Sequence, residues 1–372
     1  MKKKHGESKT KGFEMIDPLP VEKYNDIPGF IENVFGKSGF NARRLAEACA
    51  IYRRMMEEDA TICITLAGAM TPIGMSGPLI QLMEKGCVDF IISTGANLYH
   101  DLHRAFDMPM VQGSPHADDD TLRKEGLARI LDVYVADDET LMPSDRIIVE
   151  SAVSKEFDKP ISSADLHESI GQHILKQAPN PEKSFVAAAA ANGVPIYSPS
   201  PGDSSIGMNL IIPHLFGKRV PLDPLLDIVE TTAIVRAARK NGVVIVGGGA
   251  PKNFYMQTQP VLWQILRDDF GGHDFFIQMT VDSPEYGGLS GATPEEAVSW
   301  GKIKDAQQNC VVVNSCCSIT FPLLSKYALE LDLGRERKKL LLRKAEYVAE
   351  LIDAARNNSA FKQDYAGLID IS

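Results

Sequence analysis

Short apolar runs that end in small polar residues recur along the chain. Each run leads into a short stretch that contains Gly, Ser, Thr or Asn and then into a helical pattern, which is typical of βα units in a parallel sheet. The runs are 61–66, 88–92, 194–197, 243–246, 275–279 and 310–313. The pattern predicts an α/β protein whose parallel sheet is flanked by helices.

Two further helices are expected outside these units. The first starts near Asn41, a candidate N-cap, because the apolar residues that follow it fall at helical spacing. These residues are Leu45, Cys49, Ile51, Tyr52, Met55 and Met56. The second is expected at 122–131, after a solvated loop that contains His116 and the acidic residues 118–120.

The N-terminal stretch 1–28 is polar, carries Pro18, Pro20 and Pro28, and shows no strong periodicity. It therefore indicates an extension that could reach a neighbouring subunit. No internal repeat of fixed period follows it. We divide the chain into an N-terminal arm at 1–40 and a single α/β domain at 41–372.

The charge balance excludes some classes of partner. Lys and Arg total 39 against 49 Asp and Glu, a net charge of −10, so neither nucleic acid nor an anionic membrane is an expected partner. A cationic small molecule suits this charge better. No apolar run approaches the roughly 18 to 20 residues that cross a bilayer, and no apolar stretch follows the N-terminal lysines. The expected location is cytoplasmic.

Cysteine and histidine spacing predicts no metal centre. The six cysteines form no C-x-x-C pair, which argues against a zinc ribbon, and nothing indicates a disulfide framework. His100 and His103 lie three residues apart and could share an ion, but no well-placed carboxylate cluster accompanies them.

The carboxyl ends of the predicted strands are candidates for a ligand crevice. In an open parallel sheet these ends meet along one edge, and here small residues line them. Gly247, Gly248 and Gly249 follow the run 243–246, where a phosphate-binding loop would lie. Their spacing is not G-x-G-x-x-G, and a plain tight turn is the alternative.

The segment 295–302 is the most specific indication of a reactive site in the sequence. If it is helical, Glu296 and Trp300 lie on one face, and Lys302 lies near the opposite turn unless Gly301 redirects it. An apolar indole beside an amine would lower the pKa of the lysine and make it nucleophilic, or would hold a substrate cation. The alternative is a surface helix with solvated charges.

This segment carries a resemblance to a known family. The stretch 290–303, Ser-Gly-Ala-Thr-Pro-Glu-Glu-Ala-Val-Ser-Trp-Gly-Lys-Ile, together with 247–249 and 93–96, resembles the deoxyhypusine synthase family over about residues 39–324. The resemblance implies a Rossmann-like, NAD-binding catalytic domain and a homotetramer with sites at subunit interfaces. It also implies an arm that lies across a neighbouring subunit. The implied reaction moves a 4-aminobutyl group from spermidine to an acceptor amine.

The resemblance also assigns roles to individual residues. Lys302 matches the catalytic lysine that captures the aminobutyl group as an imine, and Glu296 and Trp300 match the acid and the indole of the polyamine site. The other implied substrate-binding positions are His100, Asn253, Gly287 and Gly288. The implied NAD-binding positions are Thr94, Gly95, Ala96, Asp203, Gly248, Thr280 and Val281.

Several positions depart from the family pattern. His100 replaces a glutamate, Met208 an aspartate, Leu289 a carboxylate residue of the glycine-rich loop, Asn253 a histidine, and Cys316-Cys317 replaces Asp-Ala. Each ammonium that loses its carboxylate loses roughly 1.5–3 kcal/mol of charge-assisted hydrogen bonding. The resemblance therefore points to the deoxyhypusine synthase-like branch, which includes homospermidine synthases that use free putrescine.

Three alternatives stay open beside transfer to a free polyamine. One is deoxyhypusine-type modification of a protein lysine. Another is a non-catalytic protein that binds NAD or a polyamine. The third is a hydrolase of a guanidino compound such as agmatine, with a metal at His100 and His103.

Overall fold

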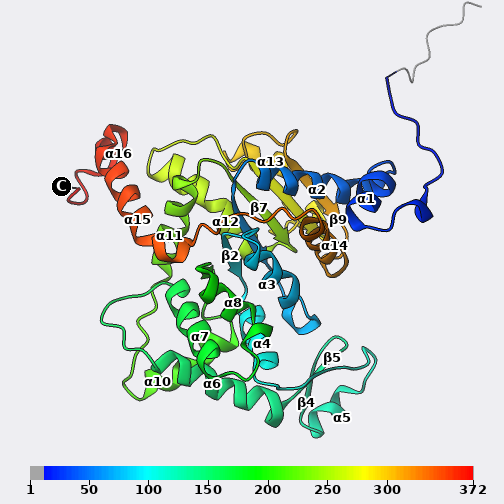
Figure 1. Cartoon of the computed structure of the whole chain (residues 1–372). Helices are drawn as coiled ribbons and strands as arrows, with labels where there is room; N and C mark the ends of the chain where they lie inside the picture. Colours follow the sequence, from blue (N-terminus) through cyan, green and yellow to red (C-terminus); the bar gives the residue numbers. More distant parts are fainter. Residues whose placement is uncertain (1–11, 372) are drawn as a thin grey trace, which may run out of the picture.

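A six-stranded parallel sheet forms the centre of the molecule (Figure 1). The computed structural model describes residues 12–371. The strand order is β6-β2-β1-β7-β8-β9, and all six predicted apolar runs contribute a strand. The strands are β1 (Thr61–Leu66), β2 (Phe90–Ser93), β6 (Ile196–Tyr197), β7 (Asn241–Val246), β8 (Phe275–Thr280) and β9 (Cys310–Asn314). The expected parallel sheet is confirmed.

Helices cover both faces of this sheet, so its central strands are buried throughout. In β1, Ile62 and Ile64 belong to one hydrophobic core and Cys63 to the other, because successive side chains point to opposite faces. The first core includes residues of α2 (Phe40–Glu57), α3 (Ser76–Glu84) and α14 (Cys317–Glu330). The second includes residues of α11 (Pro224–Ala237), α12 (Gly249–Pro260) and α15 (Leu340–Asn357).

The helix expected near Asn41 is α2, and every apolar residue predicted for it is buried. The predicted cap is wrong, because Gly39 holds the N-cap position and Asn41 lies inside the first turn. The side chain of Asn41 instead pairs with the backbone of Asn314: its Nδ2 donates to the carbonyl (2.7 Å), and its Oδ1 accepts from the N–H (3.1 Å). This pair joins the start of α2 to the carboxyl end of β9.

The helix expected at 122–131 is wrong beyond Lys124. The helix α5 covers only Asp119–Lys124, and the strands of a small antiparallel sheet, in the order β3-β5-β4, flank it in the sequence. Gly126 and Leu131 adopt positive φ angles of 71° and 56°, which stops the helix and turns the chain between strands. The strands are β3 (Met110–Gln112), β4 (Leu127–Ile130) and β5 (Val133–Ala136).

A helical region lies between β2 and β7 in the sequence and surrounds β6. Asp101 anchors it, because this buried carboxylate accepts hydrogen bonds from Ser76 Oγ (2.6 Å), Ser184 Oγ (2.5 Å) and the N–H groups of Phe185 and Val186. The helices are α4 (Gly95–Ala105), α6 (Met142–Val153), α7 (Ser163–Gln177), α8 (Phe185–Asn192), α9 (Ser205–Asn209) and α10 (Ile211–Leu215). Short helical turns are η4 (Asp137–Leu141) and η5 (Pro181–Lys183) in this region, and η3 (Thr71–Ile73), η6 (Val261–Ile265) and η7 (Pro284–Tyr286) outside it.

The N-terminal segment divides into an extended part and a packed part. Residues 12–20 are exposed and project away from the body (Figure 1). From α1 (Ile27–Phe30) and η2 (Ile31–Phe35) onward the chain packs, because Ile31 and Val34 are buried. The packed body therefore begins earlier than the boundary drawn from sequence at residue 40, and η1 (Val21–Lys23) precedes it.

The C-terminal helix α15 is held by a partly buried ionic cluster. Lys344 Nζ lies 2.5 Å from Asp165 Oδ1 and 3.0 Å from Glu230 Oε1. Nearby, Asp227 accepts hydrogen bonds from the N–H and hydroxyl of Ser163, and burial raises the pKa of Asp227 to about 7. The chain continues through α16 (Ser359–Tyr365).

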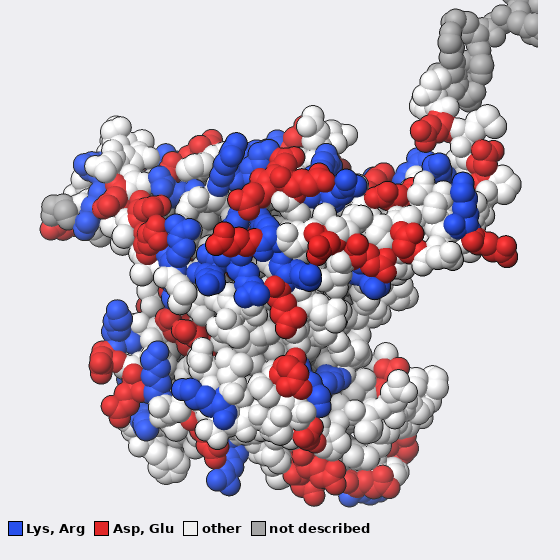
Figure 2. Space-filling view, viewed as in Figure 1, with Lys and Arg blue, Asp and Glu red and all other residues white. Residues whose placement is uncertain are grey.

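The surface is mixed in charge. Figure 2 shows acidic and basic side chains interspersed over the upper part of the face in view, rather than one continuous basic patch. Within residues 12–371 no helix has the length and apolar character needed to cross a membrane.

Candidate active site

The helix α13 (Pro294–Ser299) leads directly to Lys302. It begins at Thr293, whose Oγ accepts the N–H of Glu296 (3.2 Å), and Pro294 occupies the first turn. It ends before Trp300, and Gly301 adopts a left-handed φ of 65°. The helix predicted here is present, and Gly301 redirects the chain so that Lys302 leaves the helical path.

The backbone of Lys302 is fixed on both sides. Its N–H donates to the Ala297 carbonyl (2.9 Å), and its carbonyl accepts from the N–H of His273, just before β8 (2.9 Å). Trp263 Nε1 donates to the carbonyl of Trp300 (3.1 Å), so both tryptophans of the chain meet at this turn. This anchoring sets the direction in which the lysine side chain leaves the turn.

The surroundings of Lys302 shift the pKa of its amine. Its Nζ lies 5.5 Å from the centre of the Trp300 ring. Burial lowers the pKa of Lys302, while the Glu296 carboxylate opposes this shift. A lysine with a lowered pKa holds more of the nucleophilic free amine at neutral pH.

A cavity of about 180 Å³ contains Lys302. Four residues predicted from the sequence line it together: Lys302, Glu296, Trp300 and Asn253. The other lining residues are Lys252, Met256, Phe276, Leu289, Ala292, Thr293 and Ala297. Gly287 and Gly288 are absent from this lining, and the residue that follows them, Leu289, takes part instead.

Lys252 is a site residue that the sequence reasoning missed. Its side chain is 4% exposed, and its Nζ donates to Gln278 Oε1 (2.9 Å) and to the carbonyls of Ser290 (3.2 Å) and Ala292 (2.7 Å). Burial lowers the pKa of Lys252 to about 8, and Lys302 adds to the shift. The ammonium thereby ties the glycine-rich loop to β8 at the floor of the cavity.

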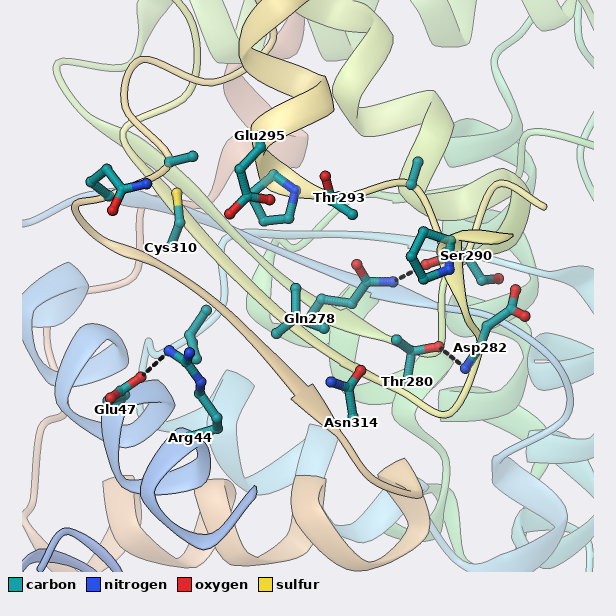
Figure 3. A pocket seen from close by; sticks show the side chains of 18 residues that line it. Arg44, Glu47, Gln278, Thr280, Asp282, Ser290, Thr293, Glu295, Cys310 and Asn314 are labelled. Carbon is teal, nitrogen blue, oxygen red and sulfur yellow. Dashed lines mark hydrogen bonds and ion pairs between the residues drawn. The ribbon is translucent and has the colours of Figure 1, made fainter. Parts of the chain in front are cut away.

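A larger polar cavity of about 540 Å³ lies beside this site and shares Ala292 and Thr293 with it (Figure 3). Several of its polar groups are already paired: Arg44 with Glu47 (2.9 Å), and Gln278 Nε2 with the Ser290 carbonyl (2.7 Å). It does not contain Lys302. We therefore place the chemistry in the smaller cavity.

Two predicted cofactor positions, Gly95 and Gly248, lie in close packing contacts. A Cβ on Gly95 would lie 2.1 Å from the Cβ of Ser204, and a Cβ on Gly248 would lie 2.5 Å from the Cα of Ser290. At both positions the absence of a side chain lets two segments of the protein pack closely together. The first contact also brings the loop that carries Asp203 against the start of α4.

The start of α4 keeps one feature that a dinucleotide site uses. Among the described residues no side chain caps this helix, so the N–H groups of Gly95 and Ala96 at the carboxyl end of β2 are available to a phosphate. Thr94 hydrogen-bonds the carbonyl of Gly68 (2.6 Å), which joins the ends of β2 and β1. NAD would be held here by these N–H groups, with the carboxylate of Asp203 suited to ribose hydroxyls.

The remaining predicted cofactor residues lie at the end of β8. Thr280 lines the larger cavity, and its hydroxyl accepts the N–H of Asp282 (3.1 Å). Val281 is exposed. These two positions lie at the same carboxyl edge of the sheet as the start of α4.

His100 is not part of the Lys302 cavity. Its Nδ1 lies 3.0 Å from His103 Nε2, and His103 Nδ1 lies 2.8 Å from Ser144 Oγ. Burial lowers the pKa of His100 to about 4 and that of His103 to about 3. The facing nitrogens bond each other and are not both directed at one ion, contrary to what the agmatine hydrolase alternative requires.

Two other departures from the family pattern lie at exposed positions. Met208, in α9, is 63% exposed. Cys316 is the exposed N-cap residue of α14, and its thiol lies 3.0 Å from the hydroxyl of Ser318. Neither side chain lines the Lys302 cavity.

The fold and the cavity define a class: an α/β protein that presents a lysine with a lowered pKa beside an indole and a carboxylate. Comparison with known proteins gives the family. The family model "DS: Deoxyhypusine synthase" matches residues 31–328. The chain therefore belongs to the deoxyhypusine synthase family, whose members are transferases, and this membership supports aminobutyl transfer from spermidine.

Similar proteins and structures agree with this assignment. A "deoxyhypusine synthase-like protein" of Thermosynechococcus vestitus is 39% identical over 350 residues, covering 90% of this chain and 86% of the relative. A "Probable deoxyhypusine synthase 2" of Methanosarcina acetivorans is 39% identical over 308 residues, covering 82% and 88%. A crystal structure from Entamoeba histolytica that bears the family name has a TM-score of 0.56 at 16% identity, covers 86% of this chain and 99% of its own, and supports the fold.

Proposed function

We propose that this protein is an NAD-dependent transferase that moves a 4-aminobutyl group from a spermidine-like donor to a small free amine. The observation that carries the proposal is the placement of Lys302, whose amine has a lowered pKa and lies beside Trp300 and Glu296 in one cavity. The expected carrier of the group is an imine on Lys302.

Each side chain has a part in this scheme. The Glu296 carboxylate pairs with the terminal ammonium of the aminobutyl group, and the Trp300 ring covers its methylene chain. Lys302 attacks the oxidised carbon and releases the remaining amine. NAD, when bound, supplies the hydride acceptor and later returns the hydride, so the overall reaction is redox-neutral.

A free amine acceptor is supported by the changes that remake the pocket. Leu289 and Asn253 stand where the family pattern has a carboxylate and a histidine, and both line the Lys302 cavity. A protein lysine as acceptor, or binding without turnover, is the alternative.

We also propose a homotetramer in which sites lie at subunit interfaces and the arm reaches a neighbouring subunit. The first eleven residues of this arm lie outside the described part of the chain.

Product analysis tests the proposal. Purified protein is incubated with NAD and spermidine, with and without putrescine, and products are identified by mass spectrometry. Homospermidine together with 1,3-diaminopropane is the expected result, and Lys302→Ala should abolish both while NAD binding stays within a few fold. Lys304→Ala is the matched control, because Lys304 lies two residues away and is paired with Asp274 at 2.7 Å. A fully active Lys302→Ala variant would sink the assignment.

A further inference from the structure

A second cavity adjoins the one that contains Lys302. It has a volume of about 300 Å³ and lies between α11 and α12, with the loop before α9 at its edge. Asn253 and Leu289 line both cavities. A substrate that fills the Lys302 cavity and extends past these two side chains would enter the second one.

The two cavities differ in charge. The Lys302 cavity is lined by Glu296, Lys252 and Lys302, whereas no Lys, Arg, Asp or Glu lines the second cavity within the described part of the chain. An ammonium placed there would be desolvated with no carboxylate to pair with, which is strongly unfavourable. The second cavity therefore suits an uncharged group.

Polar groups without partners show what kind of uncharged group fits. Thr232 lines the cavity and is 0% exposed, and its hydroxyl has no hydrogen-bond partner among the described residues. The side-chain amides of Asn253 and Gln257, also in the lining, form no hydrogen bond within residues 12–371 either. Buried polar groups are normally paired, so the Thr232 hydroxyl lacks a partner that a ligand could supply. Asn253 is half-buried and Gln257 is exposed, and their unpaired amides are free to donate to or accept from the same ligand.

We propose that the second cavity binds an amide at the far end of the amine donor, so that the preferred donor is an N-acylated polyamine. This inference rests on the proposed function. The aminobutyl end, with its free ammonium, occupies the Lys302 cavity beside Glu296. The acylated aminopropyl end lies past Asn253 and Leu289, where an amide has partners and an ammonium has none.

The chemistry stays balanced with such a donor. The carbon next to the secondary nitrogen loses a hydride to the proposed cofactor and becomes an imine carbon. The bond from Lys302 nitrogen to this carbon then forms, and the bond from the carbon to the leaving nitrogen breaks. A proton passes from the attacking nitrogen to the leaving one. The product released is an N-acylated 1,3-diaminopropane, which is uncharged at its acyl end.

Two isomers of monoacetylspermidine test the inference directly. Calorimetry with the full chain and NAD compares spermidine, the isomer acetylated on the aminopropyl end, and the isomer acetylated on the aminobutyl end. The aminopropyl isomer should bind about tenfold more tightly than the aminobutyl isomer, which cannot pair with Glu296, and at least as tightly as spermidine. Equal binding of the isomers, tighter binding of spermidine, or no binding of any amine would overturn the inference.

Variants of Thr232 separate a ligand role from a structural one. Thr232→Val keeps the shape and removes the unpartnered hydroxyl. Affinity for the aminopropyl isomer should fall about fivefold while spermidine binding is unchanged and the unliganded protein is as stable as the parent or more so. A loss of stability with unchanged affinity would contradict the role assigned to this hydroxyl.

Leu289→Asp should reverse the preference for the aminopropyl-acetylated isomer over spermidine, because it places a carboxylate between the two cavities. Leu289→Asn, which is of similar size and uncharged, should not reverse this preference. An unchanged preference in Leu289→Asp would count against the inference. Turnover distinguishes the two levels of the proposal. An aminobutyl product from spermidine, without better binding of the acetylated donor, removes only the amide site. No product and no amine adduct from any donor removes the proposed function with it.

Discussion

Gly301 should be indispensable for placing Lys302. It has a φ of 65°, and a Cβ there would lie 3.0 Å from Trp263 Nε1. An alanine in this left-handed region costs about 1–2 kcal/mol, and losing the Trp263 to Trp300 hydrogen bond costs about 1 kcal/mol more. Gly301→Ala should therefore lower the free energy of unfolding by about 2–3 kcal/mol. For a chain of 372 residues this corresponds to a fall in Tm of about 3 °C.

The catalytic effect of Gly301→Ala should exceed the effect on stability. Moving Trp263 shifts the turn that carries Lys302, and a displacement of about 1 Å can reduce a rate about 100-fold. Gly126→Ala is the matched control, because Gly126 has a φ of 71° and a methyl group added there would meet no atom within 4 Å. It should lose about 1–2 kcal/mol and keep full activity. Equal Tm values for both variants, with full activity in Gly301→Ala, would refute the reasoning.

Three further outcomes are expected. Glu296→Gln should raise KM for the polyamine about tenfold. It should also shift the acidic limb of the pH–rate profile to lower pH, because the Glu296 carboxylate raises the pKa of Lys302. The control variant Glu295→Gln should have neither effect. The pKa of Asp227 is raised to about 7 in the folded protein, so the contribution of this carboxyl group to stability is lost as pH rises from about 4 to 7. In urea unfolding at pH 8, Asp227→Asn should therefore be more stable than the parent by up to about 4 kcal/mol. Lys252→Met removes three hydrogen bonds and leaves Gln278 Oε1 and the Ala292 carbonyl unpaired, so it should lower the urea midpoint by the equivalent of about 2–4 kcal/mol.

The central sheet could be predicted because all its strands except the edge strand β9 are buried on both faces. Continuous apolar runs such as 243–246 mark such strands clearly, and the helix that contains Leu45 and Cys49 has an equally clear period. The antiparallel sheet could not be predicted in the same way, because its strands are short and half-exposed. The turn at Leu131 depends on a positive φ, which leucine rarely adopts, so the sequence gives no signal for this turn.

The site residues also divide into those that the local sequence predicts and those that it does not. Lys302, Glu296 and Trp300 lie within seven residues, so local sequence placed them together. Lys252 has no such local signal, because its acceptors lie 26 to 40 residues away, on β8 and in the glycine-rich loop. Similarly, the bond between His103 and Ser144 spans 41 residues. Which polar groups are buried, and with which partners, is decided by tertiary packing that no local pattern records.

Chemical trapping of Lys302 tests the central claim most directly. The protein is incubated with NAD and spermidine, reduced with borohydride, digested and analysed by mass spectrometry. The account predicts that the peptide containing Lys302 gains the mass of one aminobutyl group, only when both NAD and donor are present, and that the peptide containing Lys252 stays unmodified. An adduct on another lysine, or NAD-dependent product formation with Lys302 never modified, would contradict it.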